Sequence, residues 1–468
     1  MKIRTHFILS FLLLMLCTCS NIIAQITGTW QGILKIQTTE IPLVFHISKT
    51  DSGYIGSFDS PSQMANNLKF NSVIYDNDSI TCLYNTIAMK YTGKPDSTGK
   101  IINGIYTQSG FSVPLQLKKT SDDGSVIIYK RPQEPKPPFP YSSEDVSFLN
   151  PTSHLKIAGT LTLPSNSKNV PIAVMITGSG QQDRNEEIFG HKPFWVIADY
   201  FARNGIGVLR DDDRGVRGTD RGNANATSAD FATDVNAAVD YLHSRGYTNI
   251  GLIGHSEGGM IAPMVASKRK DVKFIVLLAG PGIPCNKIIY EQTYLSNKAM
   301  GINDSVARFN EACVKRITDY VKNYNGNDLK NGLSTYYDSA FKKIPQINSL
   351  NNEQYANLKK SLLNQMDSPW MVYFLKYNPA TALEQTKCPV LALDGTLDTQ
   401  VPCEEDLHAI DVALKKGGNK HFETKAMLGL NHLFQHAKTG GLPEYGTIEE
   451  TISPEVLQIM KDWILKAK

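Results

Sequence analysis

The clearest chemical signal in the chain is a serine set among glycines, in the pentapeptide at 254–258 (GHSEG). The apolar run at 250–253 predicts a short strand before it, and residues 259–267 predict a helix after it. A serine on a tight strand-to-helix turn projects its hydroxyl from the sheet, and the first N–H groups of the helix point to the same place. The flanking glycines let the backbone turn sharply and let the helix approach the strand. This context predicts that Ser256 is a nucleophile, with a glycine-rich turn without chemistry as the alternative.

A serine hydroxyl is a weak nucleophile, so it needs a base within hydrogen-bond reach and a third group that orients the base. In doubly wound sheets that carry such a serine, the chain order is serine, acid, histidine. Asp398 comes just after the predicted strand 389–395 and is the expected acid; Asp394, which closes that strand, is its rival, and either could be only a turn residue. His432 follows the predicted strand 421–427 and is the expected base, with a surface histidine as the alternative.

Nucleophilic attack on a carbonyl creates an oxyanion, which two N–H donors have to stabilise. One donor is expected to be the backbone N–H of Glu257, the residue after the candidate nucleophile. The other is expected from the glycine-rich loop 177–184, at Ser179 or Gly180; the alternative is a plain glycine turn. No Gly-Lys-Ser/Thr follows this loop, which disfavours a phosphate-binding loop. His255 is assigned a packing role.

A run of three aspartates at 211–213 raises the question of a metal site. Adjacent aspartates point in different directions, and no partner motif accompanies them, so we expect Arg214 to form a structural ion pair with one of them instead. The chain contains no C-x-x-C and no H-E-x-x-H sequence, so zinc has no support. No metal and no cofactor are expected.

The elements that would position these groups fall into two parts. Short strands at regular spacing over 25–130 predict a small all-β domain, a lipocalin-like antiparallel barrel or a sandwich; the stretch 28–32 (GTWQG) resembles the start of lipocalin-like barrels. This domain could bind a glycan or a protein partner, or could be a stabilising appendage. The proline-rich segment 131–140 predicts a semi-rigid linker.

From 141 to 468 the pattern alternates between strands and helices, with helices expected at 194–204, 229–245 and 454–466. This alternation predicts an α/β fold with a doubly wound, mostly parallel sheet and helices on both faces. About 100 residues, from about 284 to 387, interrupt it. They are polar and helical in pattern, and too long for a loop. We expect a helical cap over the site.

The first 24 residues read as a secretory signal. Lys2 and Arg4 precede the apolar run 7–16, which is too short to span a bilayer, and cleavage is expected after Ala24. The protein is therefore expected to be exported, to a periplasm or outside the cell. A lipoprotein anchored through Cys19 is the less favoured alternative. No later run is apolar and long enough to predict a membrane span.

Composition excludes some functions. The hydrophobic content of 41% and charged content of 20% are those of a globular protein. The formal net charge of +3 falls to about +1 without the two signal cations, so nothing favours nucleic acid or an anionic membrane as partner. The cysteines outside the signal are odd in number and irregular in spacing, which is no disulfide framework, although one bridge could form. They are Cys82, Cys285, Cys313, Cys388 and Cys403.

Several of these stretches together resemble the α/β-hydrolase superfamily. They are 176–186 (ITGSGQQDRNE), 191–194 (HKPF), 208–215 (VLRDDDRG), the pentapeptide, and the loops around the expected acid and histidine. Within the superfamily, the chain is most similar to EstD-like and serine aminopeptidase-like bacterial carboxylesterases, over about 155–465 without the predicted cap. The usual His-Gly of the oxyanion loop is Thr177-Gly178 here, as in the EstD-like branch.

The resemblance implies a secreted serine carboxylesterase that hydrolyses small acyl esters through an acyl-enzyme. Ser256, Asp398 and His432 would form its catalytic triad. A serine peptidase or aminopeptidase of the same fold is the first alternative. A non-catalytic binding protein with a vestigial hydrolase domain is the second, and the intact set of serine, acid and histidine argues against it.

Overall fold

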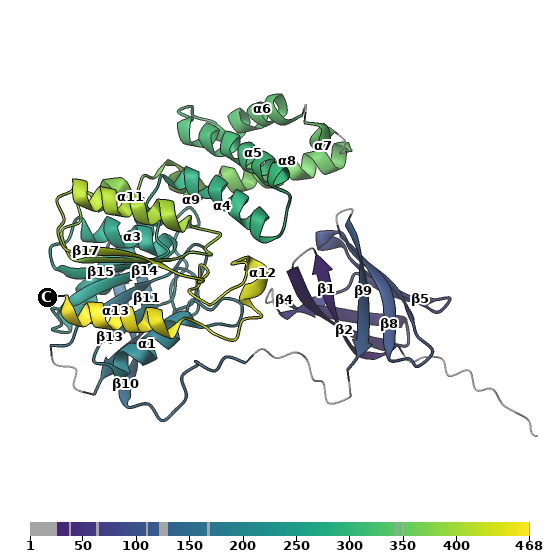
Figure 1. The fold of residues 1–468 in the computed structure, drawn as a ribbon, viewed down its shortest axis with the longest axis horizontal. Helices are drawn as coiled ribbons and strands as arrows, with labels where there is room; N and C mark the ends of the chain where they lie inside the picture. The colour runs from purple at the N-terminus through teal and green to yellow at the C-terminus, as the bar shows by residue number, and fades with distance from the viewer. Residues whose placement is uncertain are drawn as a thin grey trace, which may run out of the picture. The chain divides into compact units, whose positions relative to one another are not determined.

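The computed structural model describes residues 26–36, 39–61, 65–108, 111–120, 130–165, 169–342, 344–348 and 351–467. The predicted signal segment, with Cys19 and Ala24, lies outside these residues. The chain divides into two compact units that meet in the sequence near residue 126 (Figure 1). Among the described residues, no helix is long and apolar enough to cross a membrane.

The first unit is a closed antiparallel barrel, which decides between the barrel and the sandwich. Its described strands pair in the order β2-β1-β9-β8-β7-β6-β5-β3-β4, and a further β2–β3 pairing closes the ring, with β4 attached to β3. The strands are β1 (Gly28–Ile36), β2 (Thr39–Thr50), β3 (Gly53–Ser60), β4 (Ala65–Lys69), β5 (Ser72–Asp76), β6 (Ser79–Tyr84), β7 (Met89–Pro95), β8 (Ile101–Gln108) and β9 (Phe111–Lys119). Closure leaves few strand edges to pair with another chain.

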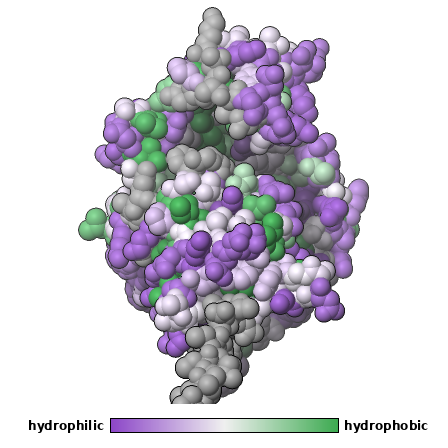
Figure 2. All heavy atoms as spheres, turned by 90° about the vertical axis from the view of Figure 1, so that its right-hand side faces the viewer, coloured by the Kyte–Doolittle hydropathy of each residue, from purple (hydrophilic) through white to green (hydrophobic). Residues whose placement is uncertain are grey.

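Large side chains fill the barrel. Trp30, Phe45 and Tyr91 are fully buried, and the Tyr91 hydroxyl lies within hydrogen-bond distance of two backbone carbonyl oxygens. Gly93 and Gly104 make room for this ring, because a Cβ at either position would come within 2.7 Å and 2.5 Å of the hydroxyl oxygen. Figure 2 shows that apolar residues on one face of the molecule are scattered among hydrophilic ones. Side chains therefore fill the interior of the barrel, as is typical of small barrels.

The second unit is built on an eight-stranded sheet in the order β10-β11-β13-β12-β14-β15-β16-β17. The first three strands in this order pair antiparallel, and the other pairs are parallel. The strands are β10 (Tyr141–Asn150), β11 (Leu155–Pro164), β12 (Ile172–Ile176), β13 (Gly207–Asp211), β14 (Ile250–His255), β15 (Val272–Leu278), β16 (Val390–Gly395) and β17 (Phe422–Met427). This mixed, mostly parallel sheet is the arrangement that the α/β-hydrolase resemblance implied.

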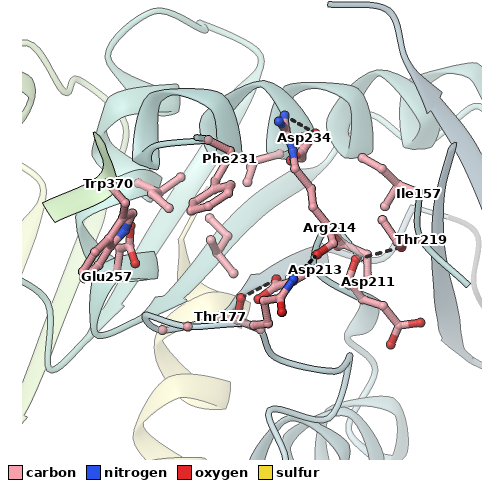
Figure 3. Close-up of a pocket in the computed structure, with 18 of the residues that line it drawn as sticks. Ile157, Thr177, Asp211, Asp213, Arg214, Thr219, Phe231, Asp234, Glu257 and Trp370 are labelled. Carbon is pink, nitrogen blue, oxygen red and sulfur yellow. Dashed lines mark hydrogen bonds and ion pairs between the residues drawn. The ribbon is translucent and has the colours of Figure 1, made fainter. Parts of the chain in front are cut away.

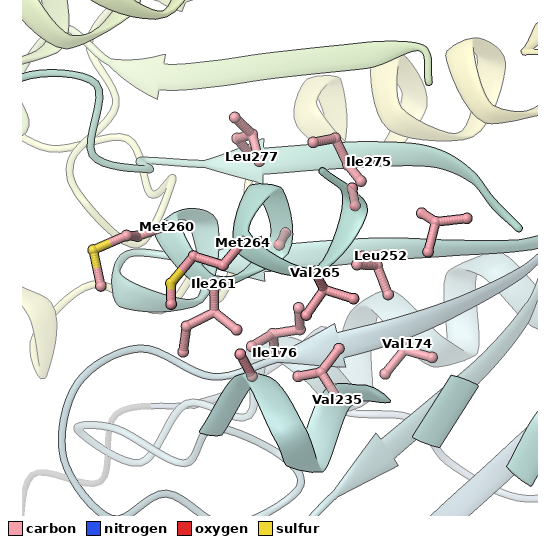
Figure 4. Packing of buried hydrophobic residues seen from close by; sticks show 14 of the residues in the cluster. Val174, Ile176, Val235, Leu252, Met260, Ile261, Met264, Val265, Ile275 and Leu277 are labelled. Atoms are coloured by element: carbon pink, nitrogen blue, oxygen red, sulfur yellow. The ribbon is translucent and has the colours of Figure 1, made fainter. Parts of the chain in front are cut away.

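Helices cover both faces of the sheet (Figure 1). One face packs against α1 (Pro193–Arg203) and α13 (Pro454–Lys466), and the other against α2 (Ser228–Ser244), α3 (Glu257–Ala266) and α11 (Cys403–Lys416). Proline at the first turn of α1 and α13 starts each helix at little cost, because those N–H groups have no helical partner. Figure 4 shows the aliphatic side chains of β12, β14 and β15 packed against α2 and α3. This apolar layer fixes the strand ends that carry the candidate site.

The described residues between β15 and β16 form helices only. They are α4 (Cys285–Ala299), α5 (Asp304–Asn323), α6 (Leu329–Phe341), α7 (Pro345–Asn348), α8 (Asn352–Met366), α9 (Pro369–Lys376) and α10 (Ala380–Leu383). Several of these helices share a small apolar core of their own, which includes Val321, Leu333 and Phe341. The helical pattern read from the sequence is therefore present, and its role as a cap stays a prediction.

The start of the proline-rich segment is anchored rather than free in solvent. The Arg131 guanidinium donates hydrogen bonds to four backbone carbonyls of the second unit, those of Phe189, Gly190, Gly446 and Ile448. The first residue of the spacer expected over 131–140 is therefore held by hydrogen bonds to the second unit. The five cysteines named above are all free, so none of them forms the bridge that the sequence left open.

Removing a core side chain tests the packing of the second unit. Leu277 on β15 is 0% exposed, so Leu277→Ala should lower the free energy of unfolding by about 2–5 kcal/mol. Leu428→Ala makes the same change at a side chain that is 87% exposed and should change it by less than about 0.5 kcal/mol. Urea denaturation followed by the circular dichroism of the helices measures both. Equal effects of the two changes would contradict the packing described.

Candidate active site

Ser256 occupies a strained turn between β14 and α3. Its φ of 53° and ψ of −119° are values that a residue with a side chain rarely adopts. Its neighbours allow this turn because they lack side chains: a Cβ on Gly254 would lie 2.0 Å from the carbonyl oxygen of Gly258, and one on Gly258 would lie 2.2 Å from that of Ile176. The glycines of the pentapeptide therefore have the packing role that the sequence analysis gave them.

His432 and Asp398 lie together beside this turn. His432 Nδ1 is 2.6 Å from Asp398 Oδ2, and both residues are buried. The other oxygen of Asp398 accepts two backbone N–H bonds, from Gln400 at 2.6 Å and Val401 at 2.9 Å, which hold the carboxylate in place. An acceptor at Nδ1 keeps the proton there and leaves Nε2 as the base. The rival, Asp394, accepts the N–H of its neighbour Gly395 and makes no hydrogen bond to His432 among the described residues.

His255, the residue before Ser256, connects the nucleophile turn to His432, and no direct hydrogen bond from Ser256 does so among the described residues. Among the described residues, no hydrogen bond joins the Ser256 hydroxyl to His432. The rings of His255 and His432 are 4.8 Å apart, and His255 Nε2 donates to the backbone carbonyl of His432 at 2.9 Å. Catalytic hydrogen bonds are often long without substrate, so this arrangement is compatible with a triad.

His255 does more than the packing expected of it. Its Nδ1 lies 3.0 Å from Glu186 Oε1, so both ring nitrogens face acceptors and both must carry a proton. Burial lowers the pKa of His255. The Glu186 carboxylate raises it, and together with smaller contributions this outweighs burial, so the net shift is upward. Glu186 Oε1 also accepts the N–H of Gly178 at 2.7 Å. This ion pair thus joins the elbow, the histidine loop and the loop after β12, and a sequence offers no sign of it.

The backbone N–H of Glu257 and that of Ser179 or Gly180 stay the predicted oxyanion donors. Gly178 is close to the nucleophile, since a Cβ on it would be 3.2 Å from that of Ser256. Its N–H is already bound by the Glu186 carboxylate, so Gly178 itself is not a free donor. The first donor, the N–H of Glu257, belongs to the first turn of α3, where N–H groups have no helical partner.

The Glu257 side chain links the elbow to the helical insertion. It is 3% exposed, and its Oε1 accepts bonds from Ser228 Oγ at 2.6 Å and Trp370 Nε1 at 2.8 Å. Burial raises the pKa of Glu257, and these two neutral donors only partly offset this. Trp370 comes from α9, more than a hundred residues away in the chain, so no local pattern could have identified it.

The aspartates at 211–213 do not form the ion pair expected of them. Arg214 Nε binds Asp234 of α2 at 2.6 Å, so its partner is none of the three. Asp234 offers both carboxylate oxygens to this guanidinium, at 2.6 Å from Nε and 3.0 Å from Nη2, whereas Asp212 pairs with Arg184. Asp213 instead accepts the Thr177 hydroxyl at 2.8 Å, which ties the loop after β12 to the end of β13. Among the described residues, no cluster of side chains suits a metal ion.

Two sequence comparisons bear on the second unit. A family model described as BAAT / Acyl-CoA thioester hydrolase C terminal matches residues 235–428. Esterase EstD of Thermotoga maritima is 29% identical over 149 residues, which are 31% of this chain and 36% of that protein. The match therefore spans about a third of the length of this curated relative.

Solved structures of similar shape include two esterases. The esterase Pf2001 of Pyrococcus furiosus is 14% identical, with 70% of this chain and 90% of that one covered and a TM-score of 0.41. Est1E of Butyrivibrio proteoclasticus, solved with bound ferulic acid, is 17% identical, with 69% and 98% covered and a TM-score of 0.39. Likenesses at this level carry no weight for substrate or mechanism.

The Glu186–His255 pair makes a testable contribution to stability. Because the pKa of His255 in the folded chain lies above its unfolded value of about 6.5, the stabilisation is fully present below that value and is lost as pH rises through the folded pKa. Glu186→Gln should therefore lower the free energy of unfolding by about 1–3 kcal/mol at mildly acidic pH, with a smaller loss in alkali. Urea denaturation over a pH series measures this.

The matched control is another glutamate–histidine pair, at the surface. Glu450 lies 2.8 Å from His436, whose side chain is 64% exposed, so Glu450→Gln should cost less than about 1 kcal/mol at any pH. A destabilisation by Glu186→Gln that stayed constant from acid to alkali would show that His255 is not the titrating partner.

Proposed function

We propose that this EstD-like α/β-hydrolase is a serine carboxylesterase that acts on small acyl esters. The single observation that carries the proposal is the juxtaposition of a buried, 2.6 Å His432–Asp398 pair with a serine at positive φ on the turn between β14 and α3. The family model and the EstD match agree with an ester- or thioester-hydrolysing reaction. Ser256, His432 and Asp398 are the proposed triad.

The reaction follows from this arrangement. The Ser256 oxygen attacks the ester carbonyl while His432 Nε2 takes its proton, and Asp398 stabilises the imidazolium through Nδ1–H. The oxyanion forms next to the N–H of Glu257 and that of Ser179 or Gly180. His432 then gives the proton to the leaving alcohol, which departs and leaves an acyl-enzyme. A water molecule, deprotonated by His432, hydrolyses that intermediate and restores the serine.

A thioester is the second candidate substrate, and one observation favours it. The matching family model describes acyl-CoA thioester hydrolases, although it covers less than half of the chain. The same triad would serve, because a thiolate leaves more readily than an alkoxide and the attack on the carbonyl is the same. Ester and thioester substrates of equal acyl length distinguish the two reactions.

Replacing the nucleophile tests the proposal directly. Ser256→Ala should lower kcat for p-nitrophenyl butyrate by at least about 10⁴-fold and abolish labelling by a fluorophosphonate, because no other group can form the acyl-enzyme. Ser267→Ala, at the other end of α3, is the matched control and should retain both. Rates with acetyl, butyryl and octanoyl esters, and with butyryl-CoA, size the acyl site and rank the two leaving groups.

Two results would contradict the proposed function. One is full activity in Ser256→Ala, which would place the nucleophile elsewhere. The other is a wild-type protein that hydrolyses none of these esters or thioesters and takes up no fluorophosphonate, which would favour a vestigial hydrolase domain. Hydrolysis of aminoacyl amides without ester hydrolysis would favour the peptidase.

A further inference from the structure

A cavity of about 540 Å³ lies beside the elbow (Figure 3). The oxyanion loop contributes Thr177 and Gly178 to its wall, and the first turn of α3 contributes Glu257. The end of β13, helix α2 and Trp370 of α9 complete it. A group bound there would contact Glu257, the residue next to Ser256, so the chemistry of this wall bears on the substrate.

Five carboxyl groups line the cavity, and two of them are neutralised by arginines. Asp212 Oδ2 lies 2.6 Å from Arg184 Nη2. Asp234 Oδ2 lies 2.6 Å from Arg214 Nε, and its other oxygen accepts a second bond from the same guanidinium. These two pairs have no charge left for a ligand.

The other three carboxyls form no ion pair among the described residues, although the Arg184 guanidinium is near enough to partly offset the rise in the pKa of Asp211. Asp213 accepts only the Thr177 hydroxyl and a backbone N–H. Glu257 uses one oxygen for both of its neutral donors, which leaves its second oxygen for a ligand. Asp211 has a buried oxygen, Oδ1, without any hydrogen-bond partner. A buried carboxyl without a partner is costly, which makes these groups a site for something that brings positive charge.

The pKa values of these carboxyls are raised, as expected where buried negative charge is not balanced by a bound cation. Burial raises the pKa of Asp213 to about 7. Burial also raises the pKa of Asp211 well above its ordinary range, and the neighbouring aspartates Asp213, Asp234 and Asp212 add to the shift. The cation that remains is Arg221, which lines the cavity but is exposed, so its guanidinium is largely solvated.

The wall also contains a group of apolar side chains that suits a short hydrocarbon chain, beside polar ones such as Gln181, Thr219 and Asn223. Phe231, Ile261 and Val235 face the cavity from α2 and α3, and Ile157 and Met175 line it from β11 and β12. An aromatic ring near a cation adds favourable electrostatics, as Phe231 already does for Arg214, whose guanidinium carbon is 5.9 Å from the ring centroid. The cavity thus combines carboxyl oxygens with apolar walls.

We propose that this cavity is a subsite for an alkylammonium group, so that the preferred substrates carry a protonated amine a few carbon atoms from the ester carbonyl. The ester part of this statement rests on the proposed function, whereas recognition of the ammonium does not. The amine N–H groups would donate to the second oxygen of Glu257 and to the carboxyl of Asp211, and Asp213 would add its negative charge. The alkyl stem would lie against the apolar side chains. Carboxylate-bearing substrates would be repelled.

Binding can be measured without any turnover. Calorimetric titration with n-pentylammonium and with n-pentanol, at about pH 8 where Asp213 is ionised, compares a cation with a neutral molecule of the same shape. We expect the cation to bind at least about tenfold more tightly, because hydrogen bonds to charged groups are the stronger ones. Asp211→Asn and, independently, Glu257→Gln should each remove most of that difference. Asp462→Asn, on α13 outside the cavity, should leave it unchanged.

Turnover then locates the cation relative to the ester. The ratio of kcat/KM for the p-nitrophenyl esters of ω-aminopentanoic and hexanoic acid should exceed about ten in the wild type and fall towards one in Asp211→Asn. Equal binding of pentylammonium and pentanol, or tighter binding of n-pentanoate, would overturn the subsite. Selective ammonium binding without hydrolysis of any ester would overturn the proposed function and leave the subsite standing.

Discussion

The site depends on one backbone constraint, the positive φ of Ser256 between β14 and α3. A serine pays a conformational cost there, and the surrounding packing has to exceed that cost. Gly254 and Gly258 allow the strand and the helix to approach within distances that any side chain would block. The apolar layer of α2 and α3 against β12, β14 and β15 then holds the turn in place. The position of the Ser256 hydroxyl is therefore a consequence of core packing.

Around this turn, charged groups are buried, and each of them holds a neighbouring side chain or backbone group in place. The Glu186 carboxylate holds both the His255 ring and the Gly178 N–H. Asp398 is held by two N–H groups and in turn holds His432. Low dielectric strengthens these bonds and makes an unpaired group costly, so buried hydrogen bonds hold these loops to one another outside the sheet.

Features that depend on residues close together in the sequence were predicted, and most contacts between residues far apart in the sequence were missed. Helices α1, α2 and α13 were expected almost at their observed bounds, because each has an apolar face at helical period and two begin with proline. Helix α11 and strand β10 were not predicted, because charged and polar residues interrupt the apolar periodicity in both. The partner of Arg214 was assigned to a neighbour, whereas Asp234 on the next helix binds it.

The sequence by itself determined the type and order of most elements, a small all-β part followed by an α/β part, and the turn on which Ser256 lies, because these depend on residues within a few positions of one another. It also indicated Asp398 and His432, through the strand ends that they follow. Only the tertiary structure decided that Glu186 and His255 join three loops, that Trp370 reaches the elbow, and that three carboxyls without an ion-pair partner share a cavity. Those contacts join residues tens to hundreds of positions apart, and their energies come from burial, which no single stretch of sequence encodes.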